Sequence, residues 1–325
     1  MNQAASPEAG SGTLNDWPLS LLDFPTSDKK GRPPDTKLVL LCAHIAIRQD
    51  SFCASARPDR IDKICDHIAR ALLTDCLTPE VASKLGGRLG FYTSLLSGKL
   101  GRGMMGPLIA RQYRQRGHKL TVDLTRNLLW RYSALGNLPP RVTPFLFLSP
   151  VGAHTDAQGF GHIAAVYMNQ TTEVALHLPS WFTKLVSETP VESPIFIYEL
   201  CAAILMVCVS LTWPADTHRT CVLCVDNKAA VAALAKGSSS SSMGSMLATL
   251  FWTLAARGST LRWIEYVHAK SNRTDFPSRE RGAPDGRKCA RSVGQCPAAF
   301  RYAFKSWYTL HEQANMVQKM KRVTP

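Results

Sequence analysis

The sequence CVDNKAAVAALAKG (Cys224–Gly237) joins an apolar strand to a helix through one acidic residue. Thr220–Val225 is an unbroken run of apolar and β-branched residues, which is typical of a strand buried on both faces. Asp226 ends that run, and Lys228–Ala235 then has the alanine-rich composition of a short helix. A buried strand that leads through an acid into a helix is typical of an α/β domain.

Similar elements surround this unit on both sides. The predicted order is strand, strand, strand, helix, strand, helix, helix, strand. The strand-rich section begins at Phe145–Leu148 and contains a hairpin over Thr155–Met168 and a strand over Thr172–Leu178. A helix over Ile195–Leu211 precedes the strand and helix described above. A helix over Met243–Arg257 and a strand over Leu261–Val267 follow them. We therefore predict an α/β fold with a mixed sheet flanked by helices.

Four acids stand in or directly after these apolar elements. Asp156 and Asp226 follow strands, Glu199 lies inside the apolar helix, and Asp275 follows the last strand. Buried charges need partners, because their desolvation costs several kcal/mol or more. Taken singly, each has an ordinary explanation: Asp226 as a helix cap, Asp156 as a turn residue, Glu199 as the partner of an arginine.

Taken together, the acids favour a metal site. Four carboxylates at one place repel one another unless divalent cations lie between them, and Mg²⁺ prefers oxygen ligands. Two such ions about 3.5–4 Å apart form the arrangement that cleaves phosphodiesters by in-line displacement.

Four ordered segments carry a resemblance to a known family. They are HTDAQGFGHIAAVY (His154–Tyr167), IYELCAAI (Ile197–Ile204), CVDNKAAVAALAKG (Cys224–Gly237) and VHAKSNRTDFPSR (Val267–Arg279). In this order they resemble the ribonuclease H segments of retroelement reverse transcriptases, and most of all those of the DIRS-like group.

The resemblance implies a ribonuclease H-like, mixed five-stranded sheet flanked by helices. It also implies that Asp156, Glu199, Asp226 and Asp275 are the catalytic and metal-binding acids. The implied activity is an endonuclease that cuts the RNA strand of RNA·DNA hybrids with two Mg²⁺ ions, or with Mn²⁺ as the alternative. Asn227 is expected to contact the nucleic acid.

The sequence departs from the family pattern within two of the matching segments. Gln158 and Phe160–Gly161 replace a small residue and a Trp–Gly pair, Ala269–Lys270 replaces Pro–Gly, and Thr274 replaces the usual Ala before the last acid. Such changes are compatible with a diverging copy of a retroelement. A catalytically inactive nucleic-acid-binding remnant is therefore the alternative function.

A third candidate is a transposase or integrase, whose last acid is usually a Glu on a helix. Here the last acid is Asp275, within an NxxD sequence, which favours the ribonuclease H reading.

The upstream region resembles the thumb and connection helices that follow a polymerase palm. The resemblance rests on Ser55–Ile68, on GGRLGF (Gly86–Phe91) and on GKLGRGMMGPL (Gly98–Leu108), and no YxDD-like motif occurs. We therefore expect no DNA synthesis by this chain, and a palm supplied by a longer polyprotein. The predicted domains are a loose lead-in (1–36), a mainly helical thumb/connection-like region (37–143), the ribonuclease H-like domain (144–280) and a basic extension (281–325).

Charge also points to a nucleic-acid partner. The formal net charge is +14, which suits a polyanion. Between residues 99 and 119 every charged residue is basic, which favours a track for the phosphate backbone over an ordinary solvated helix face. The candidates are Lys99, Arg102, Arg111, Arg114, Arg116 and Lys119.

The remaining sequence features concern the cellular compartment of the protein. The N-terminus lacks the apolar segment of a signal peptide, and no apolar run reaches the ~20 residues that cross a bilayer. The ten cysteines are therefore expected to be reduced, in a cytoplasmic or nuclear protein that is neither secreted nor membrane-bound. Cys221 and Cys224 form a CxxC inside a predicted strand, where their side chains would point to opposite faces and could not share a zinc ion.

Overall fold

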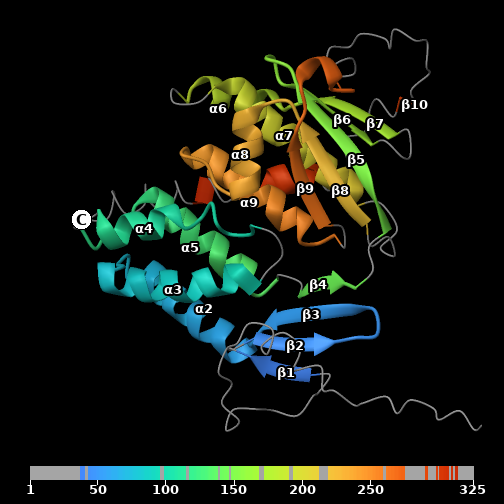
Figure 1. Cartoon of the computed structure of the whole chain (residues 1–325). Helices are drawn as coiled ribbons and strands as arrows, with labels where there is room; N and C mark the ends of the chain where they lie inside the picture. The colour runs from blue at the N-terminus through green and yellow to red at the C-terminus, as the bar shows by residue number, and fades with distance from the viewer. Residues whose placement is uncertain are drawn as a thin grey trace, which may run out of the picture.

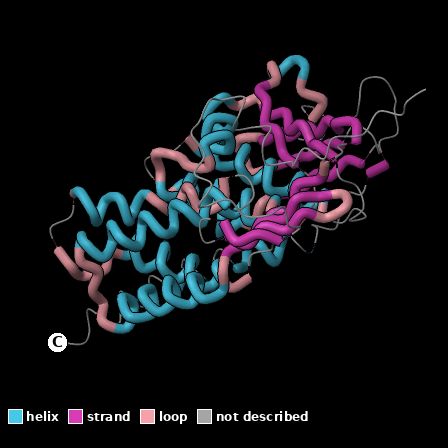
Figure 2. Tube along the Cα trace, turned by 60° about the horizontal axis from the view of Figure 1, so that its bottom comes forward, coloured by secondary structure: helices cyan, strands magenta, loops and turns pink. Residues whose placement is uncertain are grey.

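The computed structural model describes residues 37–40, 43–95, 99–114, 117–137, 140–145, 148–167, 172–189, 193–211, 219–258, 261–274, 290–291, 298, 300–306, 309 and 312–313. Two sheets organise this part of the chain. Figure 1 shows the first sheet at the bottom and the second at the upper right. In Figure 2 most strands lie on the right of the view, and the helices extend from the centre, beside the strands, to the left.

The first sheet is antiparallel, with strand order β1-β2-β3-β4. Its strands are β1 (Lys37–Leu40), β2 (Ala43–Ile47), β3 (Ser51–Ala56) and β4 (Arg141–Pro144). The stretch 37–47 thus contains two antiparallel strands, and this sheet was not predicted for a region expected to be mainly helical.

Four helices separate β3 from β4. They are α2 (Pro58–Leu73), α3 (Pro79–Leu95), α4 (Gly106–Tyr113) and α5 (Val122–Leu135). Helix α2 is amphipathic, and its Ile64 and Ile68 are buried in a core shared with α3, α4 and α5. The region is therefore rich in helices, and the four-stranded sheet is an addition to what the sequence predicted.

The second sheet has the strand order β7-β6-β5-β8-β9, extended by the two-residue strand β10 (Ala290–Arg291) at the β7 edge. Strands β5 (Leu148–Ala157), β6 (His162–Tyr167) and β7 (Thr172–His177) form an antiparallel meander. Strands β8 (Arg219–Val225) and β9 (Leu261–Tyr266) run parallel to β5. The predicted α/β fold with a mixed five-stranded sheet is confirmed.

Helices α6 (Ser180–Ser187), α7 (Pro194–Ser210), α8 (Lys228–Lys236) and α9 (Ser242–Ala255) accompany this sheet (Figure 1). The central helix is α7, which packs against β5 and β6 on one side and α9 on the other. Burial all round explains why its sequence is almost uniformly apolar. The short helix α6 was not predicted. Among the described helices, none has the length and the apolar composition to cross a membrane.

The two parts of the structure pack directly against each other. Leu100 and Met104, which precede α4, belong to the core of the second part. A side chain at Gly103 would collide with the backbone carbonyl of Ser245, so glycine is required for this close approach. Gly237 ends α8 with φ +74° and lies against Lys99, which makes glycine the suitable residue there too. The basic segment from Lys99 is thereby held at the end of α8.

Candidate metal centre

Asp156 and Asp226 lie at the same end of two neighbouring strands. Thr155 on β5 pairs in parallel register with Val225 on β8, so the next residue of each strand is an acid at the same edge. Asp156 is 5% exposed, which is unusual for an aspartate. The topology therefore brings together two acids that are 70 residues apart in sequence.

The sequence allowed Asp226 to be a helix cap and Asp156 to be a turn residue, but other groups make these bonds. Helix α8 is capped by Asn227, whose side chain accepts a hydrogen bond from the backbone N–H of Ala230 at 3.0 Å. The turn after Asp156 is closed by backbone hydrogen bonds, from Gln158 to His162 and from Gly161 to Gln158. The helix cap and the turn bonds are thus made by other groups.

Glu199 approaches this pair from helix α7. Its side chain is almost fully buried, and its Oε1 accepts the backbone N–H of Ala157 at 3.2 Å. Its other oxygen, Oε2, is buried and has no hydrogen-bond donor. Within the described part of the chain Glu199 pairs with no arginine. One ligand oxygen each from Asp156, Glu199 and Asp226 lie within 4.8 Å of one another.

The electrostatics of this cluster oppose ionisation of Glu199. Burial, followed by repulsion from Asp226 and Asp156, raises the pKa of Glu199 to about 10, against the stabilising bond from Ala157. Ionised aspartates are acceptors only, so neither can satisfy Oε2 without a proton or a cation between the oxygens. The residues present therefore fit a divalent cation, and three carboxylates suit a hard ion such as Mg²⁺ or Mn²⁺.

The fourth predicted acid, Asp275, lies outside the described residues, and its place in the site stays a prediction. The chain leading to it is described. His268 lies just beyond β9 and caps the short 3₁₀ helix Ala269–Ser271, as expected for a residue that ends the strand. Asn272 and Thr274, which follow, are both buried beside β5.

One residue of this segment escaped the sequence reasoning. Asn272 donates to the backbone carbonyl of Thr155, next to Asp156. The only sequence signal was its position three residues before Asp275. A polar residue close to a predicted acid is a weak signal, since most such residues face water.

Histidine His154 also borders the acids and was not singled out. Burial lowers the pKa of His154, although a hydrogen bond with the Asn272 side chain acts in the opposite direction. Its Nδ1 atom is buried without a hydrogen-bond partner. The imidazole therefore adds no positive charge that would neutralise the acids.

The predicted basic track is partly exposed. Arg102, Arg114 and Lys119 are exposed, Lys99 is half-buried, and Arg116 lies outside the described residues. Tyr113, among these cations, is 74% exposed. An exposed ring beside arginines can stack on bases or sugars.

The expectation for Arg111 is corrected. Its side chain is 1% exposed, and its guanidinium donates to the backbone carbonyl of Lys119. Burial lowers the pKa of Arg111. It lies three residues after buried Leu108, on the inner face of α4. Arg111 therefore supports the chain beneath the basic segment and does not face a ligand.

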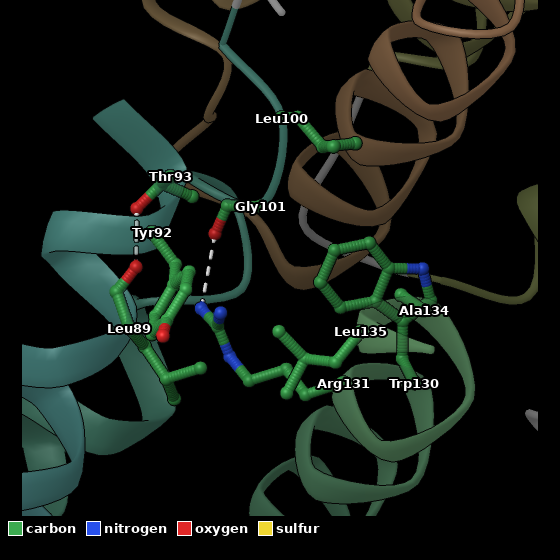
Figure 3. Close-up of a pocket in the computed structure, with 9 residues that line it drawn as sticks. All are labelled: Leu89, Tyr92, Thr93, Leu100, Gly101, Trp130, Arg131, Ala134 and Leu135. Carbon is green, nitrogen blue, oxygen red and sulfur yellow. Dashed lines mark hydrogen bonds between the residues drawn. The ribbon is translucent and has the colours of Figure 1, made fainter. Parts of the chain in front are cut away.

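A separate hollow lies between α3, α5 and the segment at Leu100 (Figure 3). It is small, with room for about one water molecule. Arg131 lines it and donates to the carbonyl of Gly101 and to Asn127, and burial lowers the pKa of Arg131 to about 9. These bonds tie the basic segment to α5, and no member of the acidic cluster lines the hollow.

No known family model matches the sequence, and no curated protein matches it. Two similar solved structures are foamy viral proteins. The foamy viral protease-reverse transcriptase dRH in complex with double-stranded DNA is 13% identical over 70% of this chain, with a TM-score of 0.25. The foamy viral protease-reverse transcriptase in complex with RNA/DNA hybrid is 14% identical over 73%, with a TM-score of 0.27. The chain spans 38% and 30% of those two proteins.

Proposed function

We propose that this chain is a metal-dependent endonuclease of ribonuclease H type, which cuts the RNA strand of RNA·DNA hybrids. One observation carries the proposal: three carboxylate oxygens from β5, α7 and the end of β8 lie within 4.8 Å at one edge of a ribonuclease H-like sheet. Acids arranged in this way cost stability unless they bind cations, so their presence favours a functional role.

Asp156 and Asp226 would bind the ions most directly, with Glu199 completing one side and Asp275 proposed for the other. When bound, two Mg²⁺ or Mn²⁺ ions would activate the attacking water and stabilise the leaving 3′ oxygen. The protein fixes the ligands beforehand. Glu199 is held by the N–H of Ala157, and the aspartates by adjacent strands in register.

We propose that the basic segment, residues 99–119, binds the duplex. Helix α8 starts directly after Asp226 and Asn227 and ends at Gly237, against Lys99. Ten residue steps of helix span about 15 Å, which is a few nucleotides along one strand. We propose that Lys99, Arg102, Arg114 and Lys119, together with Arg116, contact phosphates at that distance from the cut. Asn227, beside Asp226, is proposed to contact the strand at the site itself.

The test is cleavage of a labelled RNA·DNA hybrid by the purified chain with Mg²⁺, with Mn²⁺ and with EDTA. We expect metal-dependent cutting of the RNA strand alone. Asp226→Asn should lower cleavage by more than about 100-fold while the chain stays folded, because a metal ligand is lost. Asp59→Asn, at an exposed acid on α2, is the matched control and should cut normally.

Two outcomes would contradict the proposal in different ways. Full cleavage by Asp226→Asn would show that the acidic cluster is not the active site. Hybrid binding by a folded wild-type chain, without cutting in any metal, would support the inactive binding remnant.

A further inference from the structure

One buried side chain links the residues that precede two of the acids. Asn272 Nδ2 donates to the backbone carbonyl of Thr155 at 2.9 Å. Asn272 Oδ1 accepts from the backbone N–H of Thr274 at 3.3 Å and from its hydroxyl at 2.6 Å. Thr155 comes directly before Asp156, and Thr274 directly before Asp275.

The link spans the edge of the sheet where the metal centre lies. Strand β9 ends at Tyr266, and β8 lies between β9 and β5 in the sheet. The chain after β9 must therefore pass the end of β8, which carries Asp226, before Asn272 reaches Thr155. One segment thus joins the ends of all three parallel strands.

Burial makes these hydrogen bonds costly to lose. Asn272 is 4% exposed and Thr274 is fully buried. A buried donor or acceptor without a partner loses its bonds to water and gains nothing in return.

We propose that Asn272 and Thr274 are positioning residues of the metal centre. Their side chains hold the end of β5, and with it Asp156, against the segment that leads into Asp275. Groups that orient metal ligands in this way affect metal affinity even though they do not touch the ion. The proposal rests on the proposed function, because it assumes that these acids bind a cation.

A purely structural role would have a different signature. Buried hydrogen bonds that only stabilise the fold would lower the melting temperature and leave metal affinity unchanged once the protein is folded. Ligand positioning predicts weaker metal binding by a variant that is still folded. Metal affinity is therefore the measurement that separates the two.

The test is titration of the full chain with Mn²⁺ by isothermal calorimetry, with melting temperatures measured alongside. Thr274→Val keeps the volume and removes the hydroxyl, Thr274→Ser keeps the hydroxyl, and Asn272→Ala removes the whole link. Thr249→Val is the matched control, at a fully buried threonine whose hydroxyl donates to the carbonyl of Ser245 within α9.

We expect Asn272→Ala to weaken Mn²⁺ binding by about 10-fold or more, in the range found for such supporting residues. Thr274→Val should weaken it in the same direction, Thr274→Ser should restore it, and Thr249→Val should not change it. Should Asn272→Ala fail to fold, the two Thr274 variants decide the question. Wild-type affinity in Thr274→Val and in a folded Asn272→Ala would overturn the proposal.

Hybrid cleavage separates this proposal from the proposed function. A wild-type chain that binds Mn²⁺ but cuts no hybrid would overturn the function and keep the positioning role, provided the variants bind the ion more weakly. Absence of Mn²⁺ binding by the wild type would overturn both.

Discussion

Glu199 on α7 accepts the backbone N–H of Ala157, the residue after Asp156, at 3.2 Å. This bond ties the central helix to the end of β5 and satisfies one carboxylate oxygen. The second oxygen has no donor in the described structure and faces the aspartates. The acidic cluster is thus rigidly placed and, without a cation, electrostatically unfavourable.

The first prediction is that Glu199→Gln stabilises the metal-free protein. The amide keeps an acceptor for Ala157 and adds donors toward the aspartates, and it does not need the proton that the buried Glu199 must take up on folding near neutral pH. We expect the free energy of unfolding to rise by about 1–3 kcal/mol near neutral pH, the usual cost of an uncompensated buried polar group. Cleavage should be lost in the same variant, as expected when stability and activity conflict.

The same substitution should also change how the free energy of unfolding depends on pH. The folded-state pKa of Glu199 is raised from 4.5 to about 10, so the folded protein binds more protons than the unfolded chain between those values. The wild type should therefore lose stability as pH rises through that window, and Glu199→Gln should lose less. Urea unfolding in EDTA at about pH 5, 7 and 9 measures the slope. Identical slopes in both proteins would contradict the assignment. Glu80→Gln, at an exposed acid on α3 that pairs with Lys84, should change the free energy of unfolding by less than about 1 kcal/mol.

A second prediction concerns metal addition and removal. A cation that binds only the folded protein stabilises it by about 2.7 kcal/mol at a hundred times its Kd. Mg²⁺ or Mn²⁺ should therefore raise the melting temperature of the wild type, and EDTA should reverse the increase. Asp156→Asn should show a much smaller increase. An equal response in that variant would place the bound ion elsewhere.

The third prediction is that Asn227 and Asp226, which are adjacent at the end of β8, contribute differently to stability. Because Asn227 caps α8, Asn227→Ala should lower the free energy of unfolding by about 1 kcal/mol. Asn227→Ser retains a capping oxygen and should restore most of that loss. Asp226→Asn should show no such loss, because Asp226 does not cap the helix. Thermal unfolding in EDTA measures all three variants, and equal stability of Asn227→Ala and wild type would disprove the capping role.

The positions of the acids could be predicted from sequence because strand periodicity is local. Thr220–Val225 must be a buried strand, so the residue after it must lie at the sheet edge, whatever the rest of the chain does. The same logic indicated a position at the sheet edge for Asp156, which the structure places one residue before the end of β5. Glu199 stood out because a carboxylate inside an apolar helix has few explanations.

The features that were missed depend on distant partners. Strand β3 has the small side chains SFCASA, and its other neighbour, β4, is more than 80 residues later. Helix α6 has eight residues, too few for a clear apolar period. The carbonyl that Asn272 binds lies 117 residues away. For Arg111, the spacing of three residues from Leu108 was a local sign of burial. The basic residues around it led instead to its prediction as a phosphate contact.

The last prediction contrasts two arginines that sequence alone could not distinguish. Arg111 is buried and bonded to the Lys119 carbonyl, whereas Arg114, three residues later, is exposed at the end of α4. Arg111→Met should lower the free energy of unfolding by about 1–3 kcal/mol, because the carbonyl loses a buried charged donor. Arg114→Ala should leave stability within about 0.5 kcal/mol and weaken hybrid binding. It should also reduce the salt slope of log K by about one, as expected for one lost phosphate contact. Fluorescence anisotropy with a labelled hybrid at several salt concentrations, with urea unfolding of both variants, measures the contrast. An unchanged salt slope in Arg114→Ala would remove that residue from the binding track and leave Lys99, Arg102 and Lys119 as its described members.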